Sequence, residues 1–174
     1  MMPTYPLALP RVEGPVFALD GAMLERGLKA SRESPRRRIM LPMHRSAGEH
    51  VQRLLNFMQP GSYARPHLHP KAENIEHVVT IKGVAGFVVF DDQGNVTGAH
   101  RLEAGNPASC LIDIEQGVWH TLVPLSDDMV ALEIKRGPYD AATDKRFAPW
   151  APEENSPEAA NYLRRLEAVF DGRP

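Results

Sequence analysis

The sequence contains little cysteine and little net charge, and each shortage excludes a class of protein. Cys110 is the only cysteine among 174 residues, so the chain cannot form an internal disulfide or build a thiolate metal site by itself. The 20 basic residues nearly balance the 22 acidic ones, which leaves a net charge of −2. This balance argues against a nucleic-acid-binding protein that depends on a broad basic surface.

Long hydrophobic runs are also missing. The longest apolar runs have the length of a strand, and none approaches the roughly 20 residues that span a bilayer. The first residues, MMPTYPLALP, lack the basic region of a signal peptide. We therefore expect a cytoplasmic protein with no membrane span. A chain of 174 residues fits one compact domain.

The middle of the sequence has the pattern of an all-β protein. From residue 39 to 137, short β-branched and apolar runs alternate with glycine- or aspartate-rich turns at intervals of roughly ten residues. The expected strands are VQRLLNFM, IEHVVTIKG, AGFVVFDDQG, VTGAHRLEAG, SCLIDIEQG, HTLVPLSDD and MVALEIKRG. Antiparallel strands with no helical pattern between them predict a small sandwich or barrel.

Two helices are predicted to flank this barrel. Residues 1–38 are expected to form an N-terminal arm and a short helix, GAMLERGLKASRE, capped by Asp20. Residues 138–174 are expected to form an ordered segment and a helix that packs on the barrel, with Ser156 as its cap and Pro157 in its first position. The run PRRRIM is expected to be solvated, with anion binding as the alternative.

Histidines supply the candidate site. His67 and His69 are one residue apart, so on an extended strand their side chains point the same way and can share one ion. His120 offers a third imidazole. Neutral imidazoles together with a carboxylate suit Zn, Fe, Ni, Cu or Mn. The sequence therefore indicates a site for one divalent metal ion.

The residues around these histidines resemble the two signature motifs of the cupin superfamily. The resemblance rests on glycines and candidate ligands at characteristic spacings: Gly61, His67, His69, Glu76 and Gly83 for the first motif, and Gly117 and His120 for the second. It implies a double-stranded β-helix, also called a jelly roll or cupin barrel. It also implies that a glutamate joins the three histidines around the metal.

Two glutamates compete for that place. Glu73 has the usual cupin distance from His69, whereas Glu76 has the usual distance to Gly83 and begins a predicted strand. We favour Glu76, because the hydrogen-bond ladder of a strand holds a ligand in place, while Glu73 would lie on a lengthened loop. Glu73 remains the alternative.

Four further segments resemble the WbuC-type cupin fold metalloproteins. The resemblance covers roughly residues 35–165 and rests on LLNFMQPGSYARPHLHP, FVVFDDQGNV, GVWHTLV and above all KRGPYDAATDKRFAPWAPEEN. These are bacterial proteins often encoded among genes for O-antigen and other surface polysaccharides, including lipopolysaccharide. The resemblance implies a metal in the barrel and a carbohydrate-related small molecule as ligand, and it leaves the reaction open.

Three residues are candidates for binding that small molecule. Tyr63 and Arg65 share the parity of the histidines and would face the same side of a regular strand, where Arg65 could bind a carboxylate, a phosphate or a sugar hydroxyl. Lys135 shares a face with Glu133 in an apolar strand. For Arg65 the alternative is an ion pair in the barrel wall, and for Lys135 it is a structural salt bridge.

Three functions are compatible with these features. The leading hypothesis is a metal-dependent cupin that binds or transforms a sugar or nucleotide-sugar at the open positions of the ion. The alternatives are a metal-independent sugar epimerase or isomerase with a histidine base, and a non-catalytic sugar-binding or regulatory cupin. Barrel edges and the proline-rich arm favour a homodimer.

Overall fold

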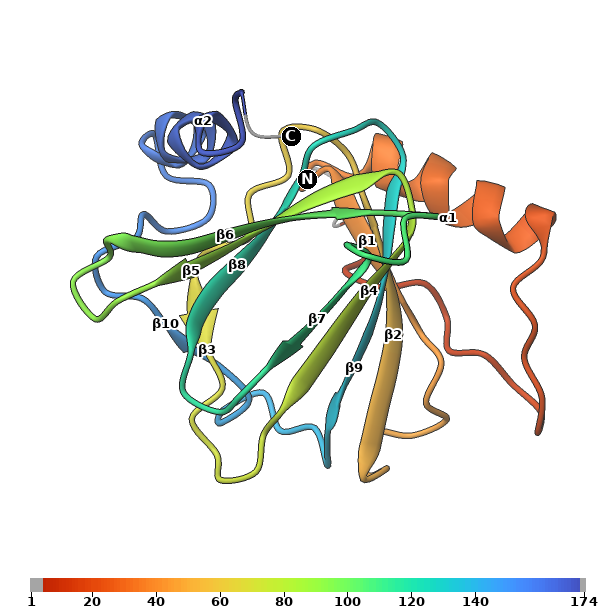
Figure 1. Ribbon diagram of the computed structural model, residues 1–174. Helices are drawn as coiled ribbons and strands as arrows, with labels where there is room; N and C mark the ends of the chain where they lie inside the picture. Colours follow the sequence, from red (N-terminus) through yellow and green to blue (C-terminus); the bar gives the residue numbers. More distant parts are fainter. Residues whose placement is uncertain (1–4, 173–174) are drawn as a thin grey trace.

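The computed structural model describes residues 5–172, so the first four residues of the predicted arm and the last two of the predicted C-terminal segment lie outside it. The strands form two five-stranded antiparallel sheets (Figure 1). In order, the first sheet contains β1 (Arg38–Pro42), β2 (Val51–Met58), β9 (Met129–Arg136), β4 (Glu76–Lys82) and β7 (Leu111–Ile114). The second contains β10 (Arg146–Phe147), β3 (His67–Leu68), β8 (Trp119–Pro124), β5 (Val84–Phe90) and β6 (Val96–Glu103). The predicted all-β jelly roll is confirmed.

Alternation along the strands separates the inside of the barrel from its outer faces. Phe87 of β5 belongs to an apolar cluster that also takes Val78 and Met129 from the opposite sheet. Its neighbour Val88 belongs to another cluster, which includes Leu163 of the C-terminal helix. The first cluster therefore fills the barrel, and the second lies between the β5–β8 sheet and the C-terminal segment.

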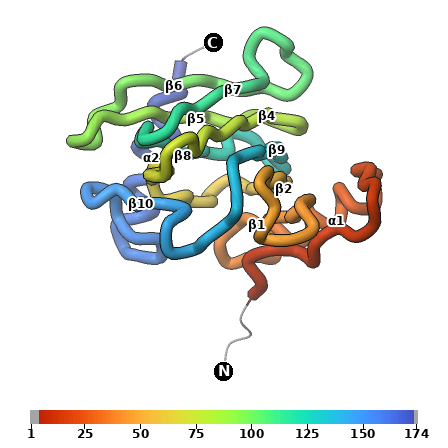
Figure 2. Tube along the Cα trace, turned by 90° about the horizontal axis from the view of Figure 1, so that it is seen from below, coloured from red at the N-terminus to blue at the C-terminus, as the bar shows by residue number. Residues whose placement is uncertain are grey.

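The N-terminal helix α1 (Gly21–Glu33) begins where the sequence predicted. The side chain of Asp20 accepts a hydrogen bond from the backbone N–H of Met23 at 2.8 Å, which satisfies one of the free donors of the first turn. Leu28 on the buried face of α1 packs against the β1–β2 edge of the first sheet, in the same apolar cluster as Phe57 of β2. Figure 2 shows α1 beside β1 and β2, on the far side of the barrel from α2.

The C-terminal helix α2 (Ala159–Ala168) begins later than predicted. Ser156 accepts a bond from Ala159 through its backbone carbonyl, and its hydroxyl has no hydrogen-bond partner. The prediction that Ser156 caps the helix was therefore wrong, because residues 156–158 form a turn ahead of the helix. Leu163 and Leu166 of α2 are buried against the barrel.

The segment between β9 and α2 is ordered and adds strand β10, which the sequence did not reveal. β10 pairs with β3, with Phe147 opposite His67. Further along, Trp150 packs on Phe90 and Trp119, with ring centroids 5.0 and 6.1 Å apart. The C-terminal segment therefore lies against the strands that carry the histidines.

The arginine run is tied to the same segment. Glu154 accepts hydrogen bonds from Arg36 at 2.6 and 2.9 Å and from Arg38 at 2.8 Å. Arg36 and Arg38 are therefore paired with a carboxylate of the same chain and do not form the fully solvated run that was expected. Within residues 5–172, neither helix has the length and apolar character needed to cross a bilayer.

Candidate metal centre

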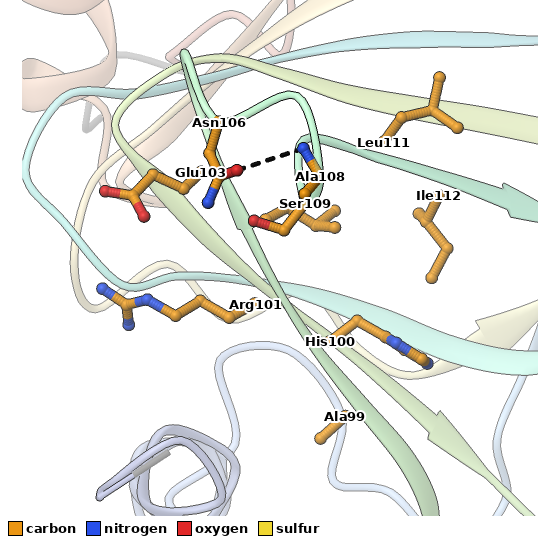
Figure 3. Close-up of a pocket in the computed structure, with 10 residues that line it drawn as sticks. Ala99, His100, Arg101, Glu103, Asn106, Ala108, Ser109, Leu111 and Ile112 are labelled. Atoms are coloured by element: carbon orange, nitrogen blue, oxygen red, sulfur yellow. Dashed lines mark hydrogen bonds between the residues drawn. The ribbon is translucent and has the colours of Figure 1, made fainter. Parts of the chain in front are cut away.

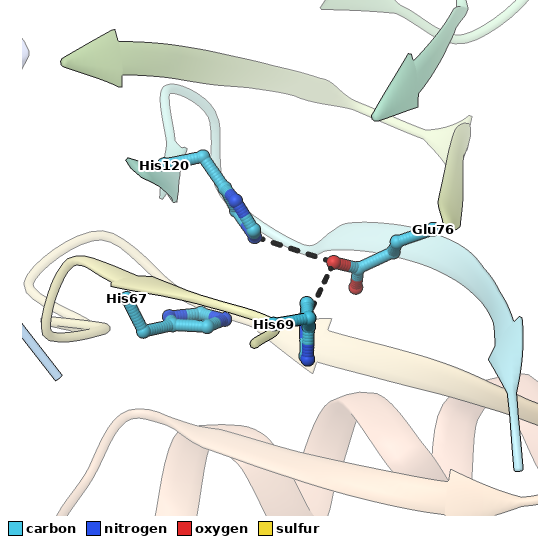
Figure 4. A group of neighbouring side chains, drawn as sticks. All are labelled: His67, His69, Glu76 and His120. Atoms are coloured by element: carbon cyan, nitrogen blue, oxygen red, sulfur yellow. Dashed lines mark hydrogen bonds and ion pairs between the residues drawn. The ribbon is translucent and has the colours of Figure 1, made fainter. Parts of the chain in front are cut away.

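Strand pairing brings the three histidines together. His67 on β3 pairs directly with His120 on β8, and His69 follows β3 by one residue. Glu76 is the first residue of β4, in the opposite sheet, and its side chain reaches across the barrel (Figure 4). All four side chains are buried, and one ligand atom from each lies within 4.8 Å of the others.

The carboxylate of Glu76 is in contact with two imidazoles. Its Oε2 atom lies 3.1 Å from Nε2 of His69 and 3.2 Å from Nε2 of His120 (Figure 4). The ring of His67 completes the group, with its centroid 5.3 Å from that of His69 and 4.6 Å from that of His120. The cluster is compact enough to surround a single ion.

Backbone carbonyls fix the orientation of each ring. The Nδ1 atoms of His67, His69 and His120 lie 3.1, 2.7 and 2.9 Å from the carbonyl oxygens of Arg65, Asp144 and Val118, respectively. A carbonyl only accepts, so each Nδ1 carries the hydrogen. In the neutral imidazole the Nε2 lone pair is then free and faces the centre, which is the arrangement that metal-ligating histidines adopt.

Burial and charge prepare two of the residues for ligation. Burial, assisted by the positive charge of Lys145, holds the pKa of His67 well below its usual value, so its imidazole stays neutral. Burial alone would raise the pKa of Glu76, but its contacts with His120 and His69 outweigh burial and hold that pKa well below the usual value. The site therefore offers a neutral imidazole and an anionic carboxylate.

Glu73 lies outside the cluster. Its backbone adopts a left-handed conformation, with φ of 60°, and its side chain is 77% exposed and paired with Arg136. Its backbone N–H bonds to Gln116, which anchors the loop. The structure thus brings Glu76, and not Glu73, to the histidines.

Tyr63 and Arg65 make their contacts with the C-terminal segment. Tyr63 packs in the outer apolar cluster, and its hydroxyl donates to the carbonyl of Pro152 at 2.9 Å. Arg65 donates to the carbonyl of Ala148 at 3.0 Å and lies 3.7 Å from Glu153. The chain from residue 59 to 66 is not a regular strand, so the parity argument does not extend from the histidines back to these residues.

Lys135 lies beside the cluster, opposite Glu76 in the β4–β9 ladder. Its ammonium is 2.8 Å from Asp144 and 3.6 Å from Glu133. Burial alone would lower its pKa, but the two carboxylates outweigh burial and raise it. Glu133 also accepts a hydrogen bond from Asn56 at 2.8 Å. These residues form a buried charged network, and Lys135 takes part in it as a salt-bridge partner.

Sequence reasoning missed Asp144, which links His69 of the cluster to the charged network. Its carbonyl accepts the hydrogen bond from His69, and its carboxylate accepts the one from Lys135. Asp144 lies in the segment after the strand rhythm ends, so no periodic pattern indicated its position. The WbuC-type resemblance around GPYDAATDKRFAPW was the one available signal.

Two cavities lie apart from the four clustered side chains, none of which lines them. A groove of about 440 Å³ runs between β6 and β7 and is lined by residues such as His100, Arg101 and Leu111 (Figure 3). A smaller cavity of about 200 Å³ lies between the loop at Lys71 and the segment from Arg136 to Asp144. The second cavity is lined in part by Asp144, whose backbone carbonyl accepts the hydrogen bond from His69.

Comparison with known proteins supports the fold. The model of a family described as Domain of unknown function (DUF6016) matches residues 19–102, and no curated protein matches. A solved structure of oxalate oxidase in complex with the substrate analogue glycolate is 15% identical, with 81% of this chain and 76% of that chain covered and a TM-score of 0.51. At this identity the similarity shows the fold alone, the double-stranded β-helix of cupins.

Two other solved structures are less similar in shape. Bacillus subtilis oxalate decarboxylase at pH 4.6 is 14% identical over 79% of this chain and 34% of that chain, with a TM-score of 0.49. The capsular polysaccharide assembling protein CapF from Staphylococcus aureus is 18% identical over 62% of this chain and 31% of that chain, also with a TM-score of 0.49. This chain therefore spans about a third of the length of either protein.

Proposed function

We propose that this protein is a metal-binding cupin that holds one divalent ion with His67, His69, Glu76 and His120. The observation that carries the proposal is the hydrogen bonding of the rings: each Nδ1 is bound to a carbonyl, and the Nε2 atoms of His69 and His120 face the carboxylate of Glu76. A lone pair 3.1 Å from a carboxylate oxygen is repelled unless a proton or a metal ion lies between them. A divalent ion resolves this repulsion.

Four protein ligands would leave two positions of an octahedral ion open to a small molecule or to water. A bound Zn, Fe, Ni or Mn ion would polarise a hydroxyl or carbonyl oxygen of that molecule. The protein contributes fixed rings, an anionic carboxylate and an apolar wall, in which Phe87 stacks on His120 at a centroid distance of 5.3 Å. These features exclude bulk water and hold the ligands in one geometry.

We propose further that the small molecule is carbohydrate-related and that the protein serves bacterial surface-polysaccharide (O-antigen) metabolism as a WbuC-type cupin. The support is the sequence resemblance over residues 35–165, including the segment that supplies Asp144 and β10. Tyr63, Arg65 and Lys135 remain candidate contacts for a larger ligand. A cytoplasmic homodimer that pairs through the sheet edges belongs to the same proposal.

Elemental analysis of the purified protein tests the metal site. We expect about one equivalent of a divalent metal in the wild type and its loss in His67→Ala, His120→Ala and Glu76→Gln. Glu73→Gln is the matched control, because the exposed Glu73 lies outside the cluster, and it should retain the metal. Full metal content in both histidine variants would refute the ligand assignment. A wild type that binds no metal after incubation with Zn, Fe, Ni or Mn would favour the metal-independent epimerase or isomerase.

A further inference from the structure

Lys145 lies next to the candidate metal centre and is none of its four proposed ligands. It follows Asp144, whose carbonyl accepts the hydrogen bond from His69, and it precedes β10. In the β10–β3 pair, Phe147 lies opposite His67 and Arg146 opposite Leu68. Continuing this register by one residue sets Lys145 opposite His69, and directly opposed residues of an antiparallel pair share a face.

The position of Arg146, the next residue, supports an orientation of Lys145 toward the histidines. Arg146 lies over the ring of Trp119, which belongs to the outer apolar cluster, at 5.2 Å. Strand alternation, continued by one residue from Arg146, places the Lys145 side chain on the other face, that of the histidines. The positive charge of Lys145 acts on these histidines, because it helps to lower the pKa of His67.

Lys145 differs from Lys135 in its partners. Lys135 is paired with Asp144 at 2.8 Å and with Glu133 at 3.6 Å. Within residues 5–172, no carboxylate lies within ion-pair distance of the Lys145 ammonium, although its side chain is partly buried. Burial and the charge of Lys135 lower the pKa of Lys145, and the more distant carboxylates of Glu133, Glu76 and Asp144 offset them only in part. A partly buried ammonium without a counter-ion is costly unless a ligand supplies the negative charge.

A count of the charges in the site also indicates that a negatively charged ligand is needed. A divalent ion, Lys135 and Lys145 together carry four positive charges. Glu76, Glu133 and Asp144 carry three negative ones when all are ionised. The loaded site therefore has an excess of one positive charge, which a bound monoanion would balance.

We propose that Lys145 binds the carboxylate of a small anionic ligand whose adjoining hydroxyl or carbonyl oxygen occupies the open positions of the ion. This inference rests on the proposed metal site and narrows its ligand class to carboxylates such as 2-hydroxy acids and sugar acids. The single excess charge favours a carboxylate over a phosphate dianion. Lys145 would select the anion, and the ion would orient the oxygen beside it.

Calorimetric titration of the full-length protein loaded with one equivalent of Zn²⁺ tests the proposal, with lactate, lactamide and inorganic phosphate as probes. Lactamide differs from lactate by the missing negative charge. The wild type should bind lactate at least about tenfold more tightly than lactamide, and more tightly than phosphate. Lys145→Met should remove this preference while Lys145→Arg retains most of it. Lys71→Met, at an exposed lysine near the smaller cavity, should behave as the wild type.

Metal content, measured on the same samples, separates the two proposals. If the wild type holds no ion, the metal site itself fails. If the ion is held but lactate binds no better than lactamide, or if Lys145→Met leaves the preference unchanged, the role of Lys145 fails and the metal site stands. Tighter binding of phosphate than of lactate would likewise overturn the assignment of a carboxylate. If Lys145→Met does not fold, the lactate–lactamide comparison in the wild type and the Lys145→Arg variant decide the matter.

Discussion

The backbone carbonyl of Asp144 accepts a hydrogen bond from Nδ1 of His69 at 2.7 Å, across 75 residues of sequence. The two residues belong to different parts of the chain, the start of the barrel and the segment that follows it. This bond directs Nε2 of His69 toward Glu76. The C-terminal segment therefore orients a candidate ligand in addition to covering the barrel.

Replacing Asp144 should weaken metal binding although its side chain is not a ligand. In Asp144→Ala, Lys135 loses its nearer carboxylate, so the backbone that presents the carbonyl to His69 is less firmly held. We expect metal affinity to fall about 10- to 100-fold, as for other losses of supporting hydrogen bonds. Competition with a chromophoric chelator measures this change. Asp113→Ala, on the exposed side of β7, should keep wild-type affinity.

Removing the metal should lower the melting temperature. A ligand that binds only the folded state stabilises it by about 4 kcal/mol when present at 1,000 times its Kd, which corresponds to roughly 10 °C for a domain of this size. Calorimetric scans with and without a chelator should show this difference in the wild type. The same scans should coincide for Glu76→Gln, and an equal chelator effect in that variant would count against Glu76 as a ligand.

The link between the arginine run and Glu154 should make stability depend on pH. Burial alone would raise the pKa of Glu154, but Arg36 and Arg38 outweigh burial and lower it. A carboxyl whose pKa is depressed by folding stabilises the protein above its unfolded pKa of about 4.3, and this contribution is lost as the pH falls through the folded pKa. Glu154→Gln should therefore cost about 1–3 kcal/mol at pH 7 and progressively less below about pH 4.

Urea unfolding of wild type and variant at several pH values measures this difference. Glu153→Gln is the control, because Glu153 is 82% exposed and its distance to Arg65 is 3.7 Å. It should change stability little at any pH. A cost of Glu154→Gln that stays constant down to pH 3 would show that the carboxylate charge is not the source of the stabilisation.

The barrel and its histidines could be predicted from the sequence because both follow local rules. Strand alternation and turn residues located β2 at 51–58 as predicted, and the spacing of His67 and His69 indicated that they share a face. Helix α1 was predictable because a side-chain cap at Asp20 marks its first turn.

What the sequence did not reveal depends on contacts between distant residues. Strand β10 has two residues, too few for any periodic signal. Tyr63 and Arg65 were placed by strand parity, which fails in the irregular chain that precedes β3. Serine is a favoured helix-capping residue, but packing of the turn that follows Ser156 delays the start of α2 to Ala159. In each case tertiary packing decided the outcome.

Packing of α1 on the barrel should be sensitive to a single methyl group. A Cβ atom added at Gly27 would lie 2.4 Å from the ring of Phe57, which is fully buried, whereas one added at Gly21 in the same helix would meet nothing within 4 Å. Gly27→Ala should therefore lower the free energy of unfolding by about 1–3 kcal/mol through overpacking. Gly21→Ala should be neutral or slightly stabilising, because alanine favours the helix. Urea unfolding of both variants measures the contrast, and metal content should be unchanged because α1 contributes no residue to the cluster. Equal stability of the two variants would show that α1 can shift away from Phe57 without loss.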